Sequence, residues 1–225
     1  MVVHFGHMKF SIVYLKVHPA SERLYKAQEQ LEESIAHFSL DPLPYPAGRK
    51  LVPIGHLLSK ARESTTGRAF VWCNSDVTLT RNPFEVPNPN QVYGFHRREI
   101  PSGEICLGVD MFYIPISIWD TILSKDIPQL FLGASYVDWW IPRLMESLGT
   151  YENLTGYLDH LSHPLSSASA NESNHYYQCN FNAYNRWAKR HALSTIPRPP
   201  VIPWLGHIWG VRDVVGKMKR RLWKK

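Results

Sequence analysis

The distribution of apolar and polar residues predicts strands and helices that alternate along most of the chain. Lys9 to Val17 is an apolar run rich in β-branched residues, which predicts a buried first strand. From Glu22 to Phe38, apolar residues recur at steps of three and four, which predicts a helix with one buried stripe. A short helix from Ile54 to Glu63 and a buried strand from Ala69 to Cys73 follow. This order indicates an α/β fold.

The same alternation continues to about residue 193. Asp41 to Gly48 contains three prolines and is predicted to be a loop. The remaining predicted elements are strands at Gln91–His96, Ile105–Ile114 and Tyr157–Leu161, and helices from Pro115 to Lys125, Tyr136 to Leu148 and Asn174 to Leu193. We therefore predict an α/β domain whose mostly parallel sheet is flanked by helices on both faces.

Composition divides the chain into a body, residues 1–195, and a tail, residues 196–225. The Pro-rich segment Ile196–Pro200 separates them. The last fifteen residues hold seven basic side chains and one acid, Asp213, and therefore carry the whole net charge of +6. Because the rest of the chain is neutral, we expect no nucleic-acid groove.

The tail has the pattern of a basic amphipathic helix. Its predicted membrane-contact residues are Trp204, Ile208, Val215, Lys219, Arg220 and Trp223. A helix docked on the body with a solvated basic face is the alternative. Without a secretory signal or a long apolar stretch, the chain is expected to be cytoplasmic, either free or peripheral at the inner face of an anionic membrane.

Candidate chemistry begins at Asn74-Ser75-Asp76, directly after the strand Ala69–Cys73. In open α/β sheets, ligands bind beyond the carboxyl ends of strands, so Asp76 can present an oxygen ligand to a divalent cation that bridges two phosphates. The alternative is a simple turn, because Asn, Ser and Asp all favour turns.

Several short segments, in this order, resemble GT-A nucleotide-sugar transferases, particularly small bacterial members with an Asn-x-Asp form of the Asp-x-Asp motif. They are Asn74–Leu79, Cys106–Tyr113, Tyr136–Trp140 and His160–His163. The second is similar to the family's Gly-x-Asp-x-Phe strand, the third to its Asp-Trp segment, and the fourth to its late histidine stretch. The resemblance implies a GT-A-like fold over residues 1–195.

The resemblance also implies roles for particular residues. Asp76 and His163 would hold Mn²⁺ or Mg²⁺, and Asn74 and Ser75 would lie near the ribose or the diphosphate of a nucleotide-sugar. Since Asn74 replaces the first Asp of the motif, one carboxylate is missing. His160 is interpreted as a structural histidine.

Two acids are candidates for the chemistry, and two arginines for donor binding. Asp138 is the candidate base for the acceptor hydroxyl, although its spacing from Ser135 also fits a helix cap. Asp110 interrupts an apolar strand and therefore needs a partner, either a sugar hydroxyl or a structural arginine. Arg97 and Arg98 could bind the diphosphate or form a solvated loop pair.

Beside Asp138, Trp139 and Trp140 could stack on a sugar or anchor the core. The predicted function is a metal-assisted glycosyltransferase that moves a sugar from a nucleotide diphosphate-sugar to a glycan or lipid-linked acceptor in surface polysaccharide biosynthesis. The rival interpretations are a metal-dependent phosphohydrolase that uses Asp76, Asp110 and His163, and a catalytically silent membrane-surface adaptor with the same fold.

Overall fold

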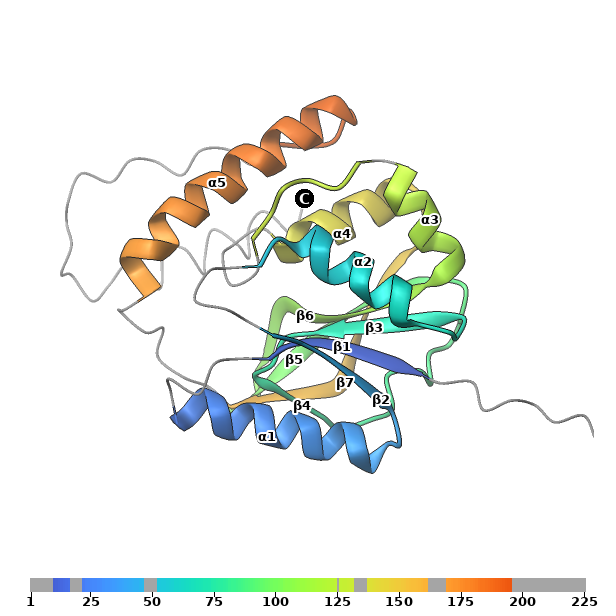
Figure 1. The fold of residues 1–225 in the computed structure, drawn as a ribbon, viewed down its shortest axis with the longest axis vertical. Helices are drawn as coiled ribbons and strands as arrows, with labels where there is room; N and C mark the ends of the chain where they lie inside the picture. The colour runs from blue at the N-terminus through green and yellow to red at the C-terminus, as the bar shows by residue number, and fades with distance from the viewer. Residues whose placement is uncertain are drawn as a thin grey trace, which may run out of the picture. The chain divides into compact units, whose positions relative to one another are not determined.

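The computed structural model in Figure 1 describes residues 10–16, 22–46, 52–124, 126–131, 137–161 and 169–195. All of these residues belong to the unit Met1–Thr195. They form an α/β fold in which helices flank a seven-stranded sheet. The predicted α/β class is therefore confirmed.

The sheet is mixed, with a parallel core at one end. Its strands are β1 (Ser11–Lys16), β2 (Asp41–Pro46), β3 (Ala69–Cys73), β4 (Val77–Leu79), β5 (Val92–Ile100), β6 (Ile105–Pro115) and β7 (Tyr151–Leu161), in the order β2-β1-β3-β6-β5-β7-β4. β1 runs parallel to β2 and β3, and β5 runs parallel to β7. β6 is antiparallel to β3 and β5, and β4 to β7. The carboxyl ends of β1 and β3 therefore share one edge.

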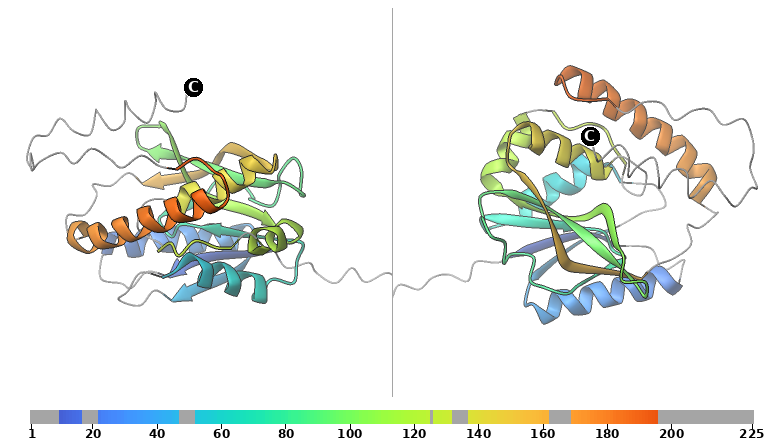
Figure 2. Two further views of the ribbon diagram at one scale, coloured as in Figure 1. Left: turned by 90° about the horizontal axis from the view of Figure 1, so that it is seen from above. Right: turned by 180° about the vertical axis from the view of Figure 1, so that it is seen from behind.

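Helices cover both faces of this sheet, as Figures 1 and 2 show. They are α1 (Glu22–His37), α2 (Ile54–Ser64), α3 (Ile116–Ser124), α4 (Val137–Ser147) and α5 (Ser169–Arg190). α1 covers one face, and α2, α3 and α4 cover the other. α5 packs on α4 through Trp140 and Trp187, whose ring centroids are 6.3 Å apart in an edge-on arrangement.

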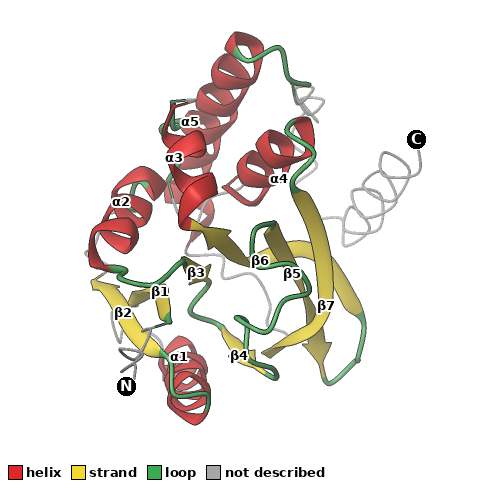
Figure 3. Ribbon diagram, turned by 90° about the vertical axis from the view of Figure 1, so that its right-hand side faces the viewer, coloured by secondary structure: helices red, strands yellow, loops and turns green. Residues whose placement is uncertain are grey.

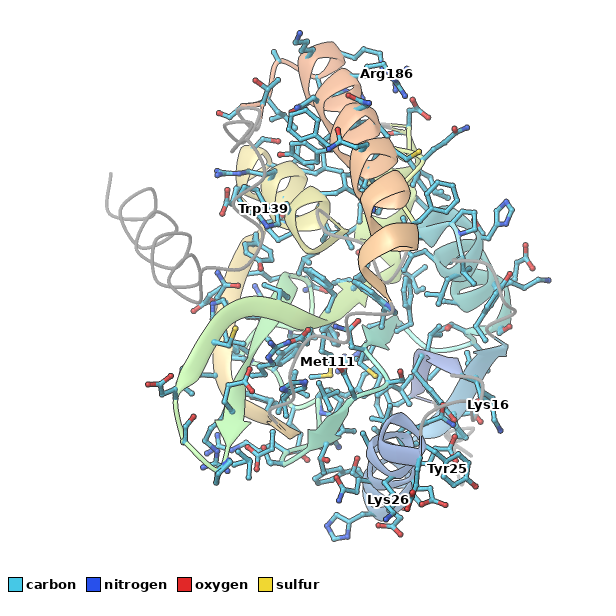
Figure 4. All side chains as sticks on the ribbon, turned by 90° about the vertical axis from the view of Figure 1, so that its left-hand side faces the viewer. Lys16, Tyr25, Lys26, Met111, Trp139 and Arg186 are labelled. Atoms are coloured by element: carbon cyan, nitrogen blue, oxygen red, sulfur yellow. The ribbon has the colours of Figure 1, made fainter. Side chains whose placement is uncertain are left out.

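The predicted apolar stripe of α1 packs into the core of the protein. Leu31 and Ile35 are fully buried in one cluster with Ile12 of β1 and Met111 of β6. In Figure 4, Met111 lies inside the molecule, whereas Tyr25 lies on the outer side of α1. Because residues 31 and 35 are one helical turn apart, the spacing of apolar residues correctly predicted which face of α1 is buried.

The predicted loop at Asp41–Gly48 was wrong over Asp41–Pro46, which form the edge strand β2. Its residues pair with β1 in parallel, and Pro42, Pro44 and Pro46 occupy alternate positions. Successive backbone N–H groups of a strand point to opposite sides, so the prolines remove only donors that would face away from β1. The amide of Asp41 donates to the carbonyl oxygen of Phe10 at 2.9 Å. An edge strand therefore tolerates this proline pattern.

Strands β5 and β7 are longer than the apolar pattern predicted, and Figure 3 shows both extending along the sheet. β5 continues to Ile100, so Arg97 and Arg98 lie within it instead of following it. Its pairing with both neighbours is irregular between Phe95 and Arg97. Such bulges re-aim side chains. The polar end of β5 begins immediately after this irregularity.

An asparagine in α5 fixes the segment that precedes α4. Asn180 Nδ2 donates to the Phe131 carbonyl oxygen at 2.9 Å, and Asn180 Oδ1 accepts from the Phe131 amide at 2.8 Å. On its other side, Phe131 forms a β-bridge with Pro53. Asn180 is completely buried, so its amide is held inside the protein by these two hydrogen bonds.

We therefore expect Asn180→Leu to lower the free energy of unfolding by about 2–4 kcal/mol, because both backbone groups of Phe131 lose their partner in Asn180. Denaturant unfolding would measure the loss. Asn182→Leu on the same helix is the control, because Asn182 is exposed. Equal losses in the two variants would contradict the assigned role of Asn180.

Candidate functional site

The turn Asn74-Ser75-Asp76 lies at the carboxyl end of β3, as the sequence predicted. Its first residue is fixed by the neighbouring strand β6. The Asn74 amide donates to the Asp110 carbonyl oxygen at 2.8 Å, and Asn74 Nδ2 donates to Asp110 Oδ1. The turn is therefore attached to β6 by both main chain and side chain.

Asp110 is a buried acid with two partners. Its side chain is 7% exposed, and Oδ2 accepts from Arg97 Nη1 at 2.7 Å. Burial raises the pKa of the Asp110 carboxyl, while the Arg97 guanidinium acts in the opposite direction. Of the two partners expected for Asp110, the structural arginine is the one observed. Because both carboxylate oxygens accept from protein groups, the geometry favours a positioning role for Asp110 over the predicted catalytic role.

Arg97 continues the connection towards β7. Its Nε donates to Glu99 Oε1 at 2.6 Å. The other oxygen of Glu99 lies 2.8 Å from Nδ1 of His160, and Nε2 of that histidine lies 3.4 Å from Asp76 Oδ2. Glu99 and His160 are register partners on the parallel strands β5 and β7, which places their side chains next to each other.

These contacts form a closed path, because Asn74 and Asp76 are two residues apart in the chain. We call it the polar ring; its members are Asn74, Asp76, Arg97, Glu99, Asp110 and His160. Four strand segments contribute to it: the end of β3, and β5, β6 and β7. Asp76 is the most exposed of its carboxylates, with 25% of the side chain accessible. Solvent therefore reaches the ring at the residue predicted to bind a cation.

The charges of the polar ring do not cancel. With Asp76, Glu99 and Asp110 ionised and Arg97 protonated, the ring carries −2 if His160 is neutral and −1 if it is protonated. The hydrogen bond to Asp76 raises the pKa of His160; burial acts in the opposite direction, and the bond to Glu99 adds to the rise. The site therefore attracts cations and repels an uncompensated diphosphate.

The described residues fit a cation that is shared with a phosphate ligand, and not one enclosed by the protein alone. Within the described ranges, no group of three or more His, Cys, Asp or Glu side chains could hold a metal ion. Mg²⁺ is often held by one or two carboxylates together with substrate phosphates, which Asp76 can satisfy. The Nε2 atom of His160 faces the same position.

Two predicted site residues, Arg98 and Ser75, are not members of the polar ring. Arg98 forms a two-pronged ion pair with Asp159, with distances of 2.8 and 2.9 Å, on an exposed part of β5 and β7. Since alternate residues of a strand face opposite sides, Arg97 and Arg98 cannot act together on one diphosphate. Ser75 is partly buried in the turn.

The two tryptophans after Asp138 differ in burial. Trp140 is completely buried against Trp187, which supports the core-anchor interpretation for this residue. Trp139, labelled in Figure 4, is partly exposed on α4. Asp138 belongs to the first turn of α4, but its side chain lies outside the described atoms, as do Ser135 and the proposed cap.

Several predictions lie outside the described residues altogether. These are His163 and the whole tail, 196–225, including its membrane-contact residues. No helix in the described part of the chain is long and apolar enough to cross a membrane. The roles of His163 and the tail stay predictions.

Sequence reasoning missed Glu99 and assigned His160 only a structural role. Arg97 and Glu99 alternate on β5, a spacing that puts both on one face of a strand. That signal was hidden because the strand was predicted to end at His96. Its partner, His160, could be identified only once the parallel pairing of β5 and β7 was known.

No protein-family profile matches the chain, and no curated protein matches it in sequence. Solved structures do show similarity in fold. One is a glycosyltransferase involved in glycosylation of the major capsid of PBCV-1, with a TM-score of 0.45, 14% identity, and coverage of 76% of this chain and 99% of that chain.

Two further structures have similar scores. Drosophila β1,4-galactosyltransferase 7, in a mutant complex with manganese, UDP-Gal and xylobiose, gives a TM-score of 0.48 at 7% identity and covers 69% of this chain and 71% of its own. Mannosyl-3-phosphoglycerate synthase from Rubrobacter xylanophilus gives 0.49 at 12% identity and covers 87% of this chain and 79% of its own. At these values the similarity concerns the path of the backbone alone; what the site can do follows from this chain's residues.

Proposed function

We propose that this chain is a glycosyltransferase that transfers a sugar from a nucleotide diphosphate-sugar to a glycan or lipid-linked acceptor, with the help of a divalent cation. The observation that carries the proposal is the polar ring, which holds Asn74-Ser75-Asp76 at the carboxyl end of β3 with the Asp76 carboxylate accessible to solvent. That edge of an α/β sheet is where phosphate-bearing ligands bind. The order of the sequence motifs supports the same interpretation.

The net charge of the polar ring supports a role for a cation. A diphosphate would meet a site that carries −1 or −2, so it needs a positive ion to bind there. Asp76 would hold this ion, and His160 is the second candidate ligand among the described residues. When bound, such an ion supplies positive charge to the leaving diphosphate. His163, the ligand predicted from the resemblance, stays a further candidate.

Asn74 and Asp138 would have separate roles in the reaction. Asn74, whose side chain donates to Asp110, would keep the turn that carries Asp76 in place. Asp138 remains the candidate base that accepts the proton of the acceptor hydroxyl as the glycosidic bond forms and the bond from the sugar to the diphosphate breaks. α4 begins at Val137, so Asp138 lies in the first turn of that helix.

We expect Asp138→Asn to lower kcat by about 100-fold or more, because an amide cannot accept the proton. KM for the nucleotide-sugar should change little, since the diphosphate binds at Asp76. Steady-state kinetics with varied donor would separate the two effects. Unchanged kcat in Asp138→Asn, together with reduced stability of Asp138→Ala, would instead identify Asp138 as a helix cap.

The phosphohydrolase alternative needs Asp110 as a ligand, but Asp110 is buried and accepts from Asn74 and Arg97. Release of nucleoside diphosphate from a panel of nucleotide-sugars, with and without simple alkyl or aryl glycosides as acceptors, distinguishes the candidates. A transferase releases diphosphate mainly when an acceptor is present. Equal release in water alone would favour hydrolysis, and no binding of any nucleotide-sugar would favour the silent adaptor. UDP-Gal and xylobiose are the first pair to test, because a similar structure contains them.

A further inference from the structure

Glu99 of β5 has an unusual position in the polar ring, because each of its carboxylate oxygens is committed to a different partner. Oε1 accepts from Arg97 Nε at 2.6 Å, and Oε2 lies 2.8 Å from His160 Nδ1. An ionised carboxylate can only accept hydrogen bonds, so Nδ1 of His160 must carry a proton. Glu99 thereby makes Nδ1 a donor and turns the other nitrogen, Nε2, towards Asp76. Without a cation, Nε2 can also donate to the Asp76 carboxylate, and a bound cation would take the place of that proton.

We propose that Glu99 is a positioning residue that orients His160 so that its Nε2 faces Asp76 and can coordinate a cation there, an inference that rests on the proposed function. Histidines that bind metals generally donate their second ring nitrogen to a carboxylate or carbonyl, which fixes the tautomer and orientation of the ring. Here Nε2 lies 3.4 Å from Asp76 Oδ2, so one cation could contact both atoms. Arg97 in turn fixes Glu99 and connects it to Asp110 and Asn74.

The same two strands provide a matched control. Arg98 and Asp159 are the register partners immediately before Glu99 and His160, and their ion pair is exposed. Asp159→Asn therefore makes the same chemical change as Glu99→Gln, from carboxylate to amide. It does so in the neighbouring register pair of β5 and β7, outside the polar ring. Gln has a single oxygen, so Glu99→Gln cannot accept from Arg97 and His160 in the same geometry.

Two measurements on the full chain test the proposal. In proton NMR, the wild type and Asp159→Asn should show a downfield, exchange-protected Nδ1–H resonance of His160, identified by its absence in His160→Gln; Glu99→Gln should lose it or shift it upfield. In Mn²⁺ titrations with UDP present, Glu99→Gln should bind about 10- to 100-fold more weakly, whereas Asp159→Asn should bind as the wild type does.

An unchanged resonance and unchanged Mn²⁺ affinity in Glu99→Gln would overturn the proposal. If that variant does not fold, the wild-type spectrum still decides, because the absence of a protected His160 Nδ1–H would contradict the assigned hydrogen bond. If the proposed function were wrong, the two measurements would give a different pattern. In that case the wild type would bind no Mn²⁺ with UDP or any other nucleoside diphosphate, while the NMR comparison would still report on Glu99.

Discussion

Asp76→Asn should lower kcat/KM for the nucleotide-sugar by at least about 100-fold. The substitution keeps the shape of the side chain and removes the negative charge that would hold the cation. The free energy of unfolding should change by less than about 1 kcal/mol, because Asp76 is partly exposed and lies 3.4 Å from His160. Activity assays and denaturant unfolding on the same preparation would test both statements.

Asp159→Asn is again the matched control, since it removes an equal charge from the exposed pair with Arg98. It should retain activity close to that of the wild type. A comparable loss of activity in the two variants would mean that overall charge, and not the position of Asp76, is responsible.

Arg97→Ala should produce the largest loss of stability, about 3–5 kcal/mol, because it leaves the buried Asp110 and the partly buried Glu99 without the Arg97 guanidinium. For a chain of this size, that loss corresponds to a decrease in Tm of roughly 10 °C. Thermal and denaturant unfolding would measure it.

Arg190→Ala isolates the effect of burial. Arg190 and Asp126 are also 2.7 Å apart, but both side chains are more than half exposed. Breaking this pair should cost less than about 1 kcal/mol. If Arg97→Ala and Arg190→Ala destabilised the protein equally, the buried pair would not have the structural importance assigned to it.

The two largest predicted effects therefore separate the functions of neighbouring side chains. Asp76 is reached by solvent and should matter for ligand binding, whereas Arg97 uses Nε and Nη1 to hold Glu99 and Asp110. A site that must hold a diphosphate and a cation benefits from such division, because fixed donors need no reorganisation when the ligand arrives.

Local patterns in the sequence predicted the main elements because most are strongly periodic or strongly apolar. The bounds of β3 match the prediction, and α1 and α2 differ from it by one residue. The missed strands were those with unusual local chemistry. β2 alternates proline, and β4 has only three residues, too short to give a period-two pattern.

Local sequence patterns predicted only part of the site. Asn74 and Asp76 are recognisable because they follow a buried strand, and Asp110 because it interrupts one. Glu99 and His160 come together through the parallel pairing of β5 with β7, which joins residues 61 apart in the chain. That pairing depends on packing of the whole sheet and leaves no local signature.

Thermal stabilisation by nucleoside diphosphates tests the central claim most directly. With Mn²⁺ present, one diphosphate should raise the Tm of the wild type by several degrees, the effect should vanish without the cation, and Asp76→Asn should show none of it. The base of the effective diphosphate would also identify the donor. Equal stabilisation of wild type and Asp76→Asn, or no response of the wild type to any diphosphate with Mn²⁺, would contradict a cation-assisted diphosphate site at Asp76.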